Sequence, residues 1–165
     1  MDCGSSKIKI EKPKSLETNN TRLIMRKIDK IVVHCTATPE GRAVSVGDID
    51  SWHKKRGWSQ IGYHYVVQLD GEINSGRPIE ISGAHCKGHN KTSIGITYVG
   101  GVDADMNAKD TRTDAQIDSL EYLVGYLCAS YPGSEVFGHC NFSSKDCPSF
   151  NAQEEYKSIQ EKYVR

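Results

Sequence analysis

Residues 31–35 read Ile31-Val32-Val33-His34-Cys35, and a segment rich in turn residues follows them, Thr36-Ala37-Thr38-Pro39-Glu40-Gly41. A short apolar run bounded by turn residues is typical of a buried strand. Similar segments lie at residues 63–69, 94–99 and 135–138, and the first of these ends in Asp70-Gly71, a turn dipeptide that predicts a hairpin. The chain is therefore expected to build a sheet, with His34 at the end of one strand.

Helix signals lie between the expected strands. Ser45 and Asp48 form a capping-box pattern, and apolar residues recur at helical spacing after them, which predicts a helix of about ten residues. Thr113 and Gln116 form a second capping box, followed by an apolar face made of Ile117, Leu120, Leu123, Val124, Leu127 and Cys128. Asn151 is expected to cap a C-terminal helix. Strands interleaved with helices predict an α/β or α+β fold, in which helices flank a central mixed sheet.

The chain of 165 residues is long enough to build one domain with a buried core. Residues 1–25 mix Lys, Ser, Thr and Asn without periodicity, so we interpret them as a flexible N-terminal arm. A single compact domain is expected at residues 26–165. Hydrophobic residues make up 37% of the chain and charged residues 25%, which places it outside the class of disordered proteins.

Charge and hydropathy argue against two classes of partner. The 21 Lys and Arg residues balance 21 Asp and Glu residues, so the composition does not predict a strongly basic surface for nucleic acid. No stretch approaches the roughly 18 to 20 apolar residues that span a bilayer. The N-terminus lacks an apolar segment typical of a secretory signal, so we expect the protein to be cytoplasmic as synthesised. A lipoprotein or exported form beginning at Cys3 is the alternative.

Six cysteines invite the interpretation of a disulfide framework. With no signal toward an oxidising compartment, reduced thiols are expected instead. Cys35, Cys86 and Cys128 lie in or beside apolar runs, where a free cysteine packs as a small buried residue. Cys140 and Cys147 flank a polar loop.

His34, His139 and Cys147 form a candidate metal site. His34 and His139 stand where two expected strands end, and Cys147 follows in the next loop. Rigid elements present side chains to a rim at such places. Two imidazoles and a thiolate suit zinc, and three protein ligands leave a fourth position for water, as in catalytic sites. Taken singly, each residue also fits a packing role.

Five short motifs add a family resemblance: Val33-His34-Cys35-Thr36-Ala37-Thr38, Gly62-Tyr63-His64-Tyr65-Val66-Val67, Gly83-Ala84-His85-Cys86-Lys87-Gly88-His89-Asn90, Ser93-Ile94-Gly95-Ile96 and Lys145-Asp146-Cys147-Pro148-Ser149-Phe150. In this order they resemble the type 2 zinc N-acetylmuramoyl-L-alanine amidases. That family includes amidase-type phage lysozymes and peptidoglycan recognition proteins. The resemblance extends from about residue 31 to residue 150, which is most of the chain.

The resemblance implies hydrolysis of the amide bond between N-acetylmuramic acid and L-alanine in peptidoglycan. It implies one Zn²⁺ per chain, bound by His34, His139 and Cys147, and it assigns catalytic roles to Tyr63 and Lys145. The fold implied is that of the amidases and peptidoglycan recognition proteins. A phage or prophage endolysin that acts as a monomer on the cell wall fits this set.

The substrate groove is the least defined part of the expected site. His85, Lys87 and Asn90 lie in a glycine-punctuated segment and are expected to bind glycan or peptide, with solvent exposure as the alternative for each.

Two other functions remain open. Some family members bind peptidoglycan without cutting it and have lost the zinc cysteine, so a non-catalytic recognition module is the main alternative. The presence of Cys147 favours catalysis. An inhibitory contact with another enzyme, made by the arm and one face of the domain, is a further alternative.

Overall fold

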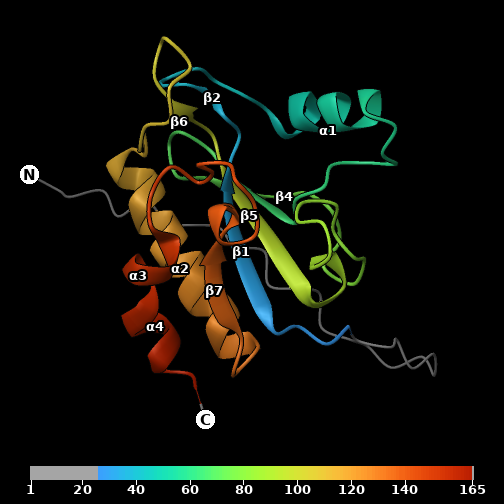
Figure 1. Ribbon diagram of the computed structural model, residues 1–165, viewed down its shortest axis with the longest axis vertical. Coiled ribbons are helices and arrows are strands. Elements are labelled where there is room, and N and C mark those ends of the chain that lie inside the picture. Colours follow the sequence, from blue (N-terminus) through green and yellow to red (C-terminus); the bar gives the residue numbers. More distant parts are fainter. Residues whose placement is uncertain (1–25, 165) are drawn as a thin grey trace, which may run out of the picture.

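The computed structural model describes residues 26–164, which form a sheet with helices around it (Figure 1). The sheet consists of β1 (Lys30–Cys35), β3 (Tyr65–Val67), β4 (Ile73–Ser75), β5 (Ser93–Tyr98) and β7 (Glu135–Gly138). Their spatial order is β4-β3-β5-β1-β7. β1 pairs in parallel with β5 and β7, β5 pairs in parallel with β3, and β4 is antiparallel to β3. The expected α/β domain with a mixed sheet is confirmed.

The remaining elements are short strands and helices at the ends and faces of the sheet. They are β2 (Thr38–Pro39), β6 (Gly101–Val102), α1 (Val46–Lys55), α2 (Asp114–Ser130), α3 (Ala152–Glu155), α4 (Lys157–Glu161) and the 3-10 turns η1 (Asn90–Thr92) and η2 (His139–Asn141). β2 and β6 pair in parallel as a separate two-stranded sheet.

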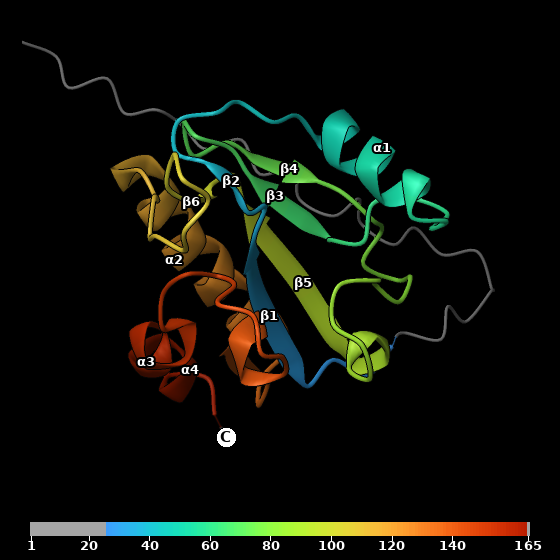
Figure 2. The ribbon, with the colours of Figure 1, turned by 45° about the horizontal axis from the view of Figure 1, so that its top comes forward.

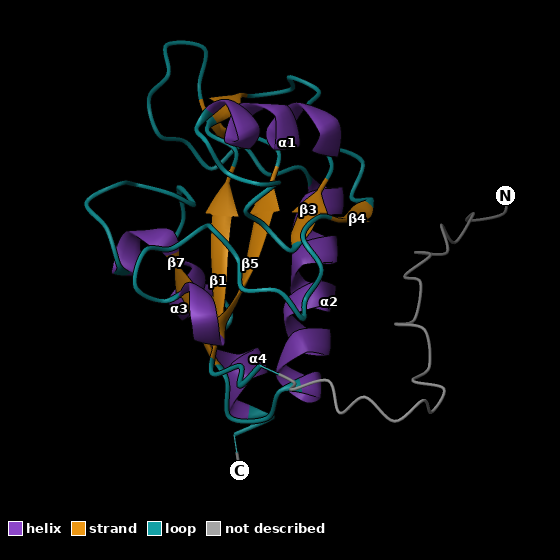
Figure 3. Cartoon of the chain, turned by 90° about the vertical axis from the view of Figure 1, so that its right-hand side faces the viewer, coloured by secondary structure: helices purple, strands orange, loops and turns teal. Residues whose placement is uncertain are grey.

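Helix α2 covers one face of the sheet, and α1 lies beyond the carboxyl ends of β1 and β5 (Figures 2 and 3). The core between α2 and the sheet contains Ile31 and Val33 from β1 together with Leu120 and Leu127 from α2, all fully buried. Because side chains alternate along a strand, His34 points to the other face, away from α2. That face, at the carboxyl end of β1, is where the candidate site lies.

The local sequence signals are confirmed where they were strongest. The side chains of Ser45 and Thr113 cap α1 and α2, each in a complete capping box. The turn at Asp70-Gly71 joins β3 to β4, with Gly71 at a φ of 85° that favours glycine. Asn151 caps the C-terminal helical segment, accepting a hydrogen bond from the Glu154 N–H.

The structure differs from the expectations in three places. The C-terminal helix is broken into α3 and α4 at Tyr156. Tyr63 lies two residues before β3, not inside a strand. The β2–β6 pair was not expected, because two-residue strands carry no periodic signal.

Two further expectations concern the cysteines and membrane-spanning segments. Among the residues that the structure describes, five cysteines are free thiols, and Cys35, Cys86 and Cys128 are buried as expected. None of the helices between residues 26 and 164 is long and apolar enough to cross a membrane. The arm expected at residues 1–25 lies outside the described residues.

Candidate active site

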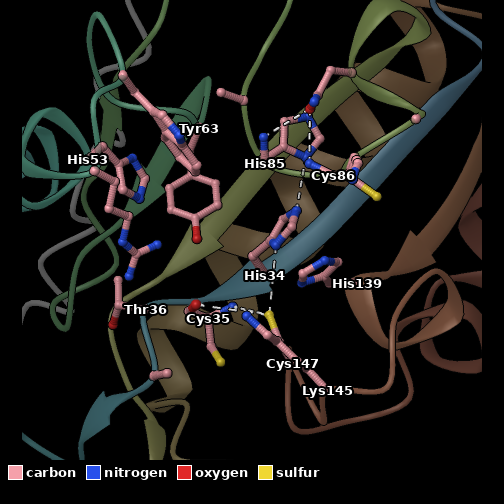
Figure 4. A pocket seen from close by; sticks show the side chains of 17 residues that line it. His34, Cys35, Thr36, His53, Tyr63, His85, Cys86, His139, Lys145 and Cys147 are labelled. Atoms are coloured by element: carbon pink, nitrogen blue, oxygen red, sulfur yellow. Dashed lines mark hydrogen bonds between the residues drawn. The ribbon is translucent and has the colours of Figure 1, made fainter.

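A pocket of about 610 Å³ lies at the carboxyl ends of β1 and β7 (Figure 4). It is lined by all eight residues singled out in the sequence: His34, Tyr63, His85, Lys87, Asn90, His139, Lys145 and Cys147. These residues come from distant parts of the chain. His34 and His139 meet there because the parallel strands β1 and β7 bring their carboxyl ends to one edge of the sheet. The segments that precede β3 and β5 bring Tyr63, His85, Lys87 and Asn90 to the same pocket.

His34, His139 and Cys147 converge on one point. One ligand atom from each of them lies within 4.8 Å of the other two. His34 Nδ1 is 3.8 Å from Cys147 Sγ, and the rings of His34 and His139 have centroids 4.6 Å apart. Two imidazole nitrogens and one sulfur are a donor set that fits zinc, with a coordination position left open. The residues present therefore fit the metal that the sequence suggests.

The parallel pairing of β1 with β7 brings the two histidines together. Val33 and Gly138 are register partners, so the residues that follow them, His34 and His139, emerge side by side. His34 is 1% exposed at the end of the buried strand. His139 begins the η2 turn, whose Asn141 side chain accepts a hydrogen bond from the Gly138 N–H at 2.8 Å.

The loop that carries Cys147 is attached to the sheet by several hydrogen bonds. Cys147 Sγ accepts the backbone N–H of Cys35 at 3.3 Å, and the Cys147 carbonyl accepts the N–H of Cys140 at 2.7 Å. The Tyr98 hydroxyl donates to the Pro148 carbonyl, and the Ser149 hydroxyl donates to that of Gly101, both at 2.7 Å. Cys147 is therefore fixed against the ends of β1 and β5.

Burial sets the protonation of these side chains. It lowers the pKa of His34 well below the ordinary value, and together with the charge of Lys145 it lowers the pKa of His139. Both imidazoles are thus neutral at neutral pH, which is the form that binds a metal. The neighbouring Cys35 thiol and burial raise the pKa of Cys147, so its thiolate needs a cation beside it.

Tyr63 and Lys145 flank the three convergent side chains. The Tyr63 ring lies 5.1 Å from the His34 ring, and its hydroxyl points into the pocket (Figure 4). Burial raises the pKa of Tyr63, so the hydroxyl keeps its proton and remains a hydrogen-bond donor. Lys145 is exposed on the loop before Cys147 and lines the same pocket.

Residues 25–150 match the family described as N-acetylmuramoyl-L-alanine amidase. The chain belongs to this family. The endolysin of Klebsiella phage KP32 is 40% identical over 122 residues, which are 74% of this chain and 81% of the relative. The amidase LysC from Clostridium intestinale has a TM-score of 0.69 and 31% identity over 84% of this chain and 87% of that one. Drosophila PGRP-LB, with 22% identity and a TM-score of 0.67 over 80% and 81% of the two chains, shares the fold.

The protein is thus an enzyme, an amidase that cleaves between N-acetylmuramic acid and L-alanine. The three residues expected in its substrate groove lie in different settings. His85 is 8% exposed and its Nδ1 lies 2.9 Å from His34 Nε2. Asn90 Oδ1 accepts the backbone N–H groups of His85 and Cys86, each at 2.9 Å, and so shapes the loop. Lys87 is exposed at the rim of the pocket.

The residues that line the amidase pocket also include His53 and Arg56, which the sequence did not single out. His53 Nδ1 accepts the N–H of Gly62 at 2.8 Å, and its ring lies 5.3 Å from that of Tyr63. Arg56 lies over the Trp58 ring at 5.9 Å. A spacing of three residues at the end of an expected helix places His53 and Arg56 on one side, but only the fold turns that side toward the pocket.

Proposed function

We propose that this amidase uses one zinc ion held by His34, His139 and Cys147, and that it degrades cell-wall peptidoglycan as an endolysin. The observation that carries the zinc proposal is the approach of three ligand atoms to within 4.8 Å of one another in the pocket. The 40% identity to an endolysin of a Klebsiella phage supports the biological role. One chain supplies all the residues of the site, which favours a monomer as the active form.

The chemistry adds water across a C–N bond: the oxygen goes to the lactyl carbonyl carbon, and a proton goes to the amine of L-alanine. Bound zinc supplies Lewis acidity toward the carbonyl and the attacking water. Tyr63, which stays protonated, donates a hydrogen bond to the carbonyl oxygen as negative charge develops there. Lys145 adds a positive charge to the same pocket. His34 and His139 remain neutral ligands because burial disfavours their protonation.

The rim of the pocket suits a substrate made of sugar and peptide. Trp58 is 36% exposed and offers an aromatic face for a sugar ring, with Arg56 beside it. We assign Lys87, exposed on another part of the rim, to a hydrogen bond or ion pair with the glycan or the stem peptide. Polymeric peptidoglycan and soluble muropeptides both present these groups.

The test compares the wild type with Cys147→Ser on purified peptidoglycan, with mass spectrometry of the products and metal analysis of both proteins. Free stem peptides that begin with L-alanine, made by a wild type carrying one zinc and not by the variant, are the expected result. Cys140→Ser is the matched control, because Cys140 is an exposed thiol close to the same loop. The control should keep its zinc and its activity.

Two outcomes would contradict the proposal. A wild type that cleaves without bound metal would refute the zinc site. A zinc-loaded wild type that binds peptidoglycan but releases no peptide from any wall type would favour a recognition module.

A further inference from the structure

His85 connects His34 to the interior of the sheet. Its Nδ1 lies 2.9 Å from His34 Nε2, and its own Nε2 lies 3.2 Å from Ser93 Oγ. Both contacts are buried, and the rings of His34 and His85 meet at an interplanar angle of 88° (Figure 4). Both ring nitrogens of His85 are thus engaged by protein groups.

A metal on Nδ1 of His34, together with the contacts of His85, determines where the ring protons lie. Nδ1 of His34 faces Cys147 Sγ at 3.8 Å, so this nitrogen must keep its lone pair free for a metal. The proton of neutral His34 is then on Nε2, which donates to Nδ1 of His85. His85 must in turn carry its proton on Nε2, from which it donates to the Ser93 hydroxyl. With Nδ1 of His34 reserved for the metal, one assignment of protons satisfies both contacts.

Two glycines leave space for the His85 ring. A Cβ added to Gly95 would meet Cγ and Cδ2 of His85 at 2.5 Å, and a Cβ added to Gly83 would meet Cδ2 at 2.5 Å. Any larger residue at either position would displace the ring. The backbone of His85 is held as well, because its N–H donates to Asn90 Oδ1 at 2.9 Å.

We propose that His85 is a positioning residue, which holds His34 in the orientation and tautomer that direct Nδ1 toward the metal, while Ser93 fixes His85 itself. The inference rests on the proposed zinc site. Hydrogen-bond partners of ligand histidines typically change metal affinity 10- to 100-fold when they are removed. The proposal also explains the pattern Ser93-Ile94-Gly95: Ser93 supplies the acceptor, Gly95 supplies the space, and Ile94 points to the core on the other face.

Two substitutions of His85 separate the hydrogen bond from packing. His85→Phe keeps a flat ring over Gly95 but leaves the Nε2–H of His34 without an acceptor. His85→Asn places an amide oxygen at the same number of bonds from the backbone as Nδ1, and so retains an acceptor. Ser93→Ala leaves His85 in place but frees it to adopt the other tautomer, in which two N–H groups face each other.

Zinc affinity is measured for each full-length variant by competition with a chromophoric chelator. We expect His85→Phe to bind zinc about 10- to 100-fold more weakly and His85→Asn to recover most of that loss. Ser93→Ala should lie between His85→Phe and the wild type. In ¹⁵N NMR spectra of the zinc-loaded protein, the His34 Nε2–H proton should exchange with water faster in His85→Phe and Ser93→Ala. A role confined to packing predicts neither the recovery by Asn nor the change in exchange.

Zinc affinities of His85→Phe and Ser93→Ala equal to that of the wild type would overturn the positioning role. An Asn variant as weak as the Phe variant would also overturn it, because the acceptor would then be irrelevant. Should His85→Phe fail to fold, as judged by circular dichroism, the comparison of His85→Asn and Ser93→Ala with the wild type decides the question. A wild type that binds no zinc would refute the proposed zinc site instead, so the two failures are distinguishable.

Discussion

Replacing Gly95 by alanine would test how closely the sheet and the candidate metal site are coupled. β5 lies between two parallel neighbours: Gly95 is the register partner of Val32 in β1, and its carbonyl accepts the N–H of His64 at 2.8 Å. The strand is thus held on both sides, and the added methyl group, 2.5 Å from the His85 ring, must push that ring out of its position. Overpacking of this kind costs about 1–3 kcal/mol. The displaced ring would also lose its contact with His34.

We therefore expect the free energy of unfolding of Gly95→Ala to fall by about 2 kcal/mol, which corresponds to a Tm lower by roughly 4–8 °C. Zinc affinity, measured by chelator competition, should fall by about tenfold or more. Denaturant unfolding of the metal-free protein, followed by circular dichroism, gives the stability without a contribution from zinc.

Gly125→Ala is the matched control for Gly95→Ala. A Cβ at Gly125, inside α2, would meet Ile159 Cγ2 at 3.7 Å, which is an ordinary contact. Alanine is favoured over glycine in a helix by about 0.5–1 kcal/mol, so this variant should be at least as stable as the wild type. A Gly95→Ala protein with wild-type stability and wild-type zinc affinity would refute the reasoning.

Three further predictions concern catalysis and pH. Tyr63→Phe should lower kcat by about 10²- to 10³-fold with zinc content unchanged, because it removes one donor to the developing oxyanion; a loss of zinc would contradict that role. Lys145→Ala should lower kcat by roughly 10- to 100-fold in the same assay. The effect is smaller than that of Tyr63→Phe because solvent screens an exposed charge. An unchanged kcat would contradict the catalytic role of Lys145. The metal-free protein should lose stability as the pH falls from 6.5 to about 4, since burial lowers the pKa of His53 and His64 to about 4 from 6.5. In that window the unfolded chain binds protons that the folded chain excludes, which costs about 1.4 kcal/mol per pH unit for each histidine. Urea unfolding at several pH values between 6.5 and 4 measures this dependence. A free energy of unfolding that does not change with pH would contradict the prediction.

Much of the fold could be predicted because its signals are local. The capping boxes at Ser45 and Thr113 and the turn at Asp70-Gly71 each depend on residues at most three positions apart. The convergence of His34, His139 and Cys147 could be predicted for a different reason. Zinc selects nitrogen and sulfur donors, and strand ends followed by loops are where such donors can converge.

The parts that could not be predicted depend on contacts between distant segments. The hydrogen bond between His34 and His85 spans 51 positions, and no periodicity encodes it. His85 was expected to bind glycan or peptide because its side chain is polar. In the structure it is buried, with 8% of its surface exposed. His53 was missed for a similar reason, because its partner Gly62 lies beyond the end of the helix that carries it.

Glycines explain how Tyr63 and His85 come to lie against the same ring. The motifs that carry these two residues begin with Gly62 and Gly83, and a Cβ at Gly62 would collide with the Ala84 carbonyl. A Cβ at Gly83 would lie 3.0 Å from the Gly62 carbonyl, which itself accepts the Ala84 N–H at 3.1 Å. The two backbones therefore touch at a distance that only glycine allows. Since each glycine shortly precedes its functional residue, this contact sets Tyr63 and His85 with ring centroids 5.1 and 5.0 Å from that of His34.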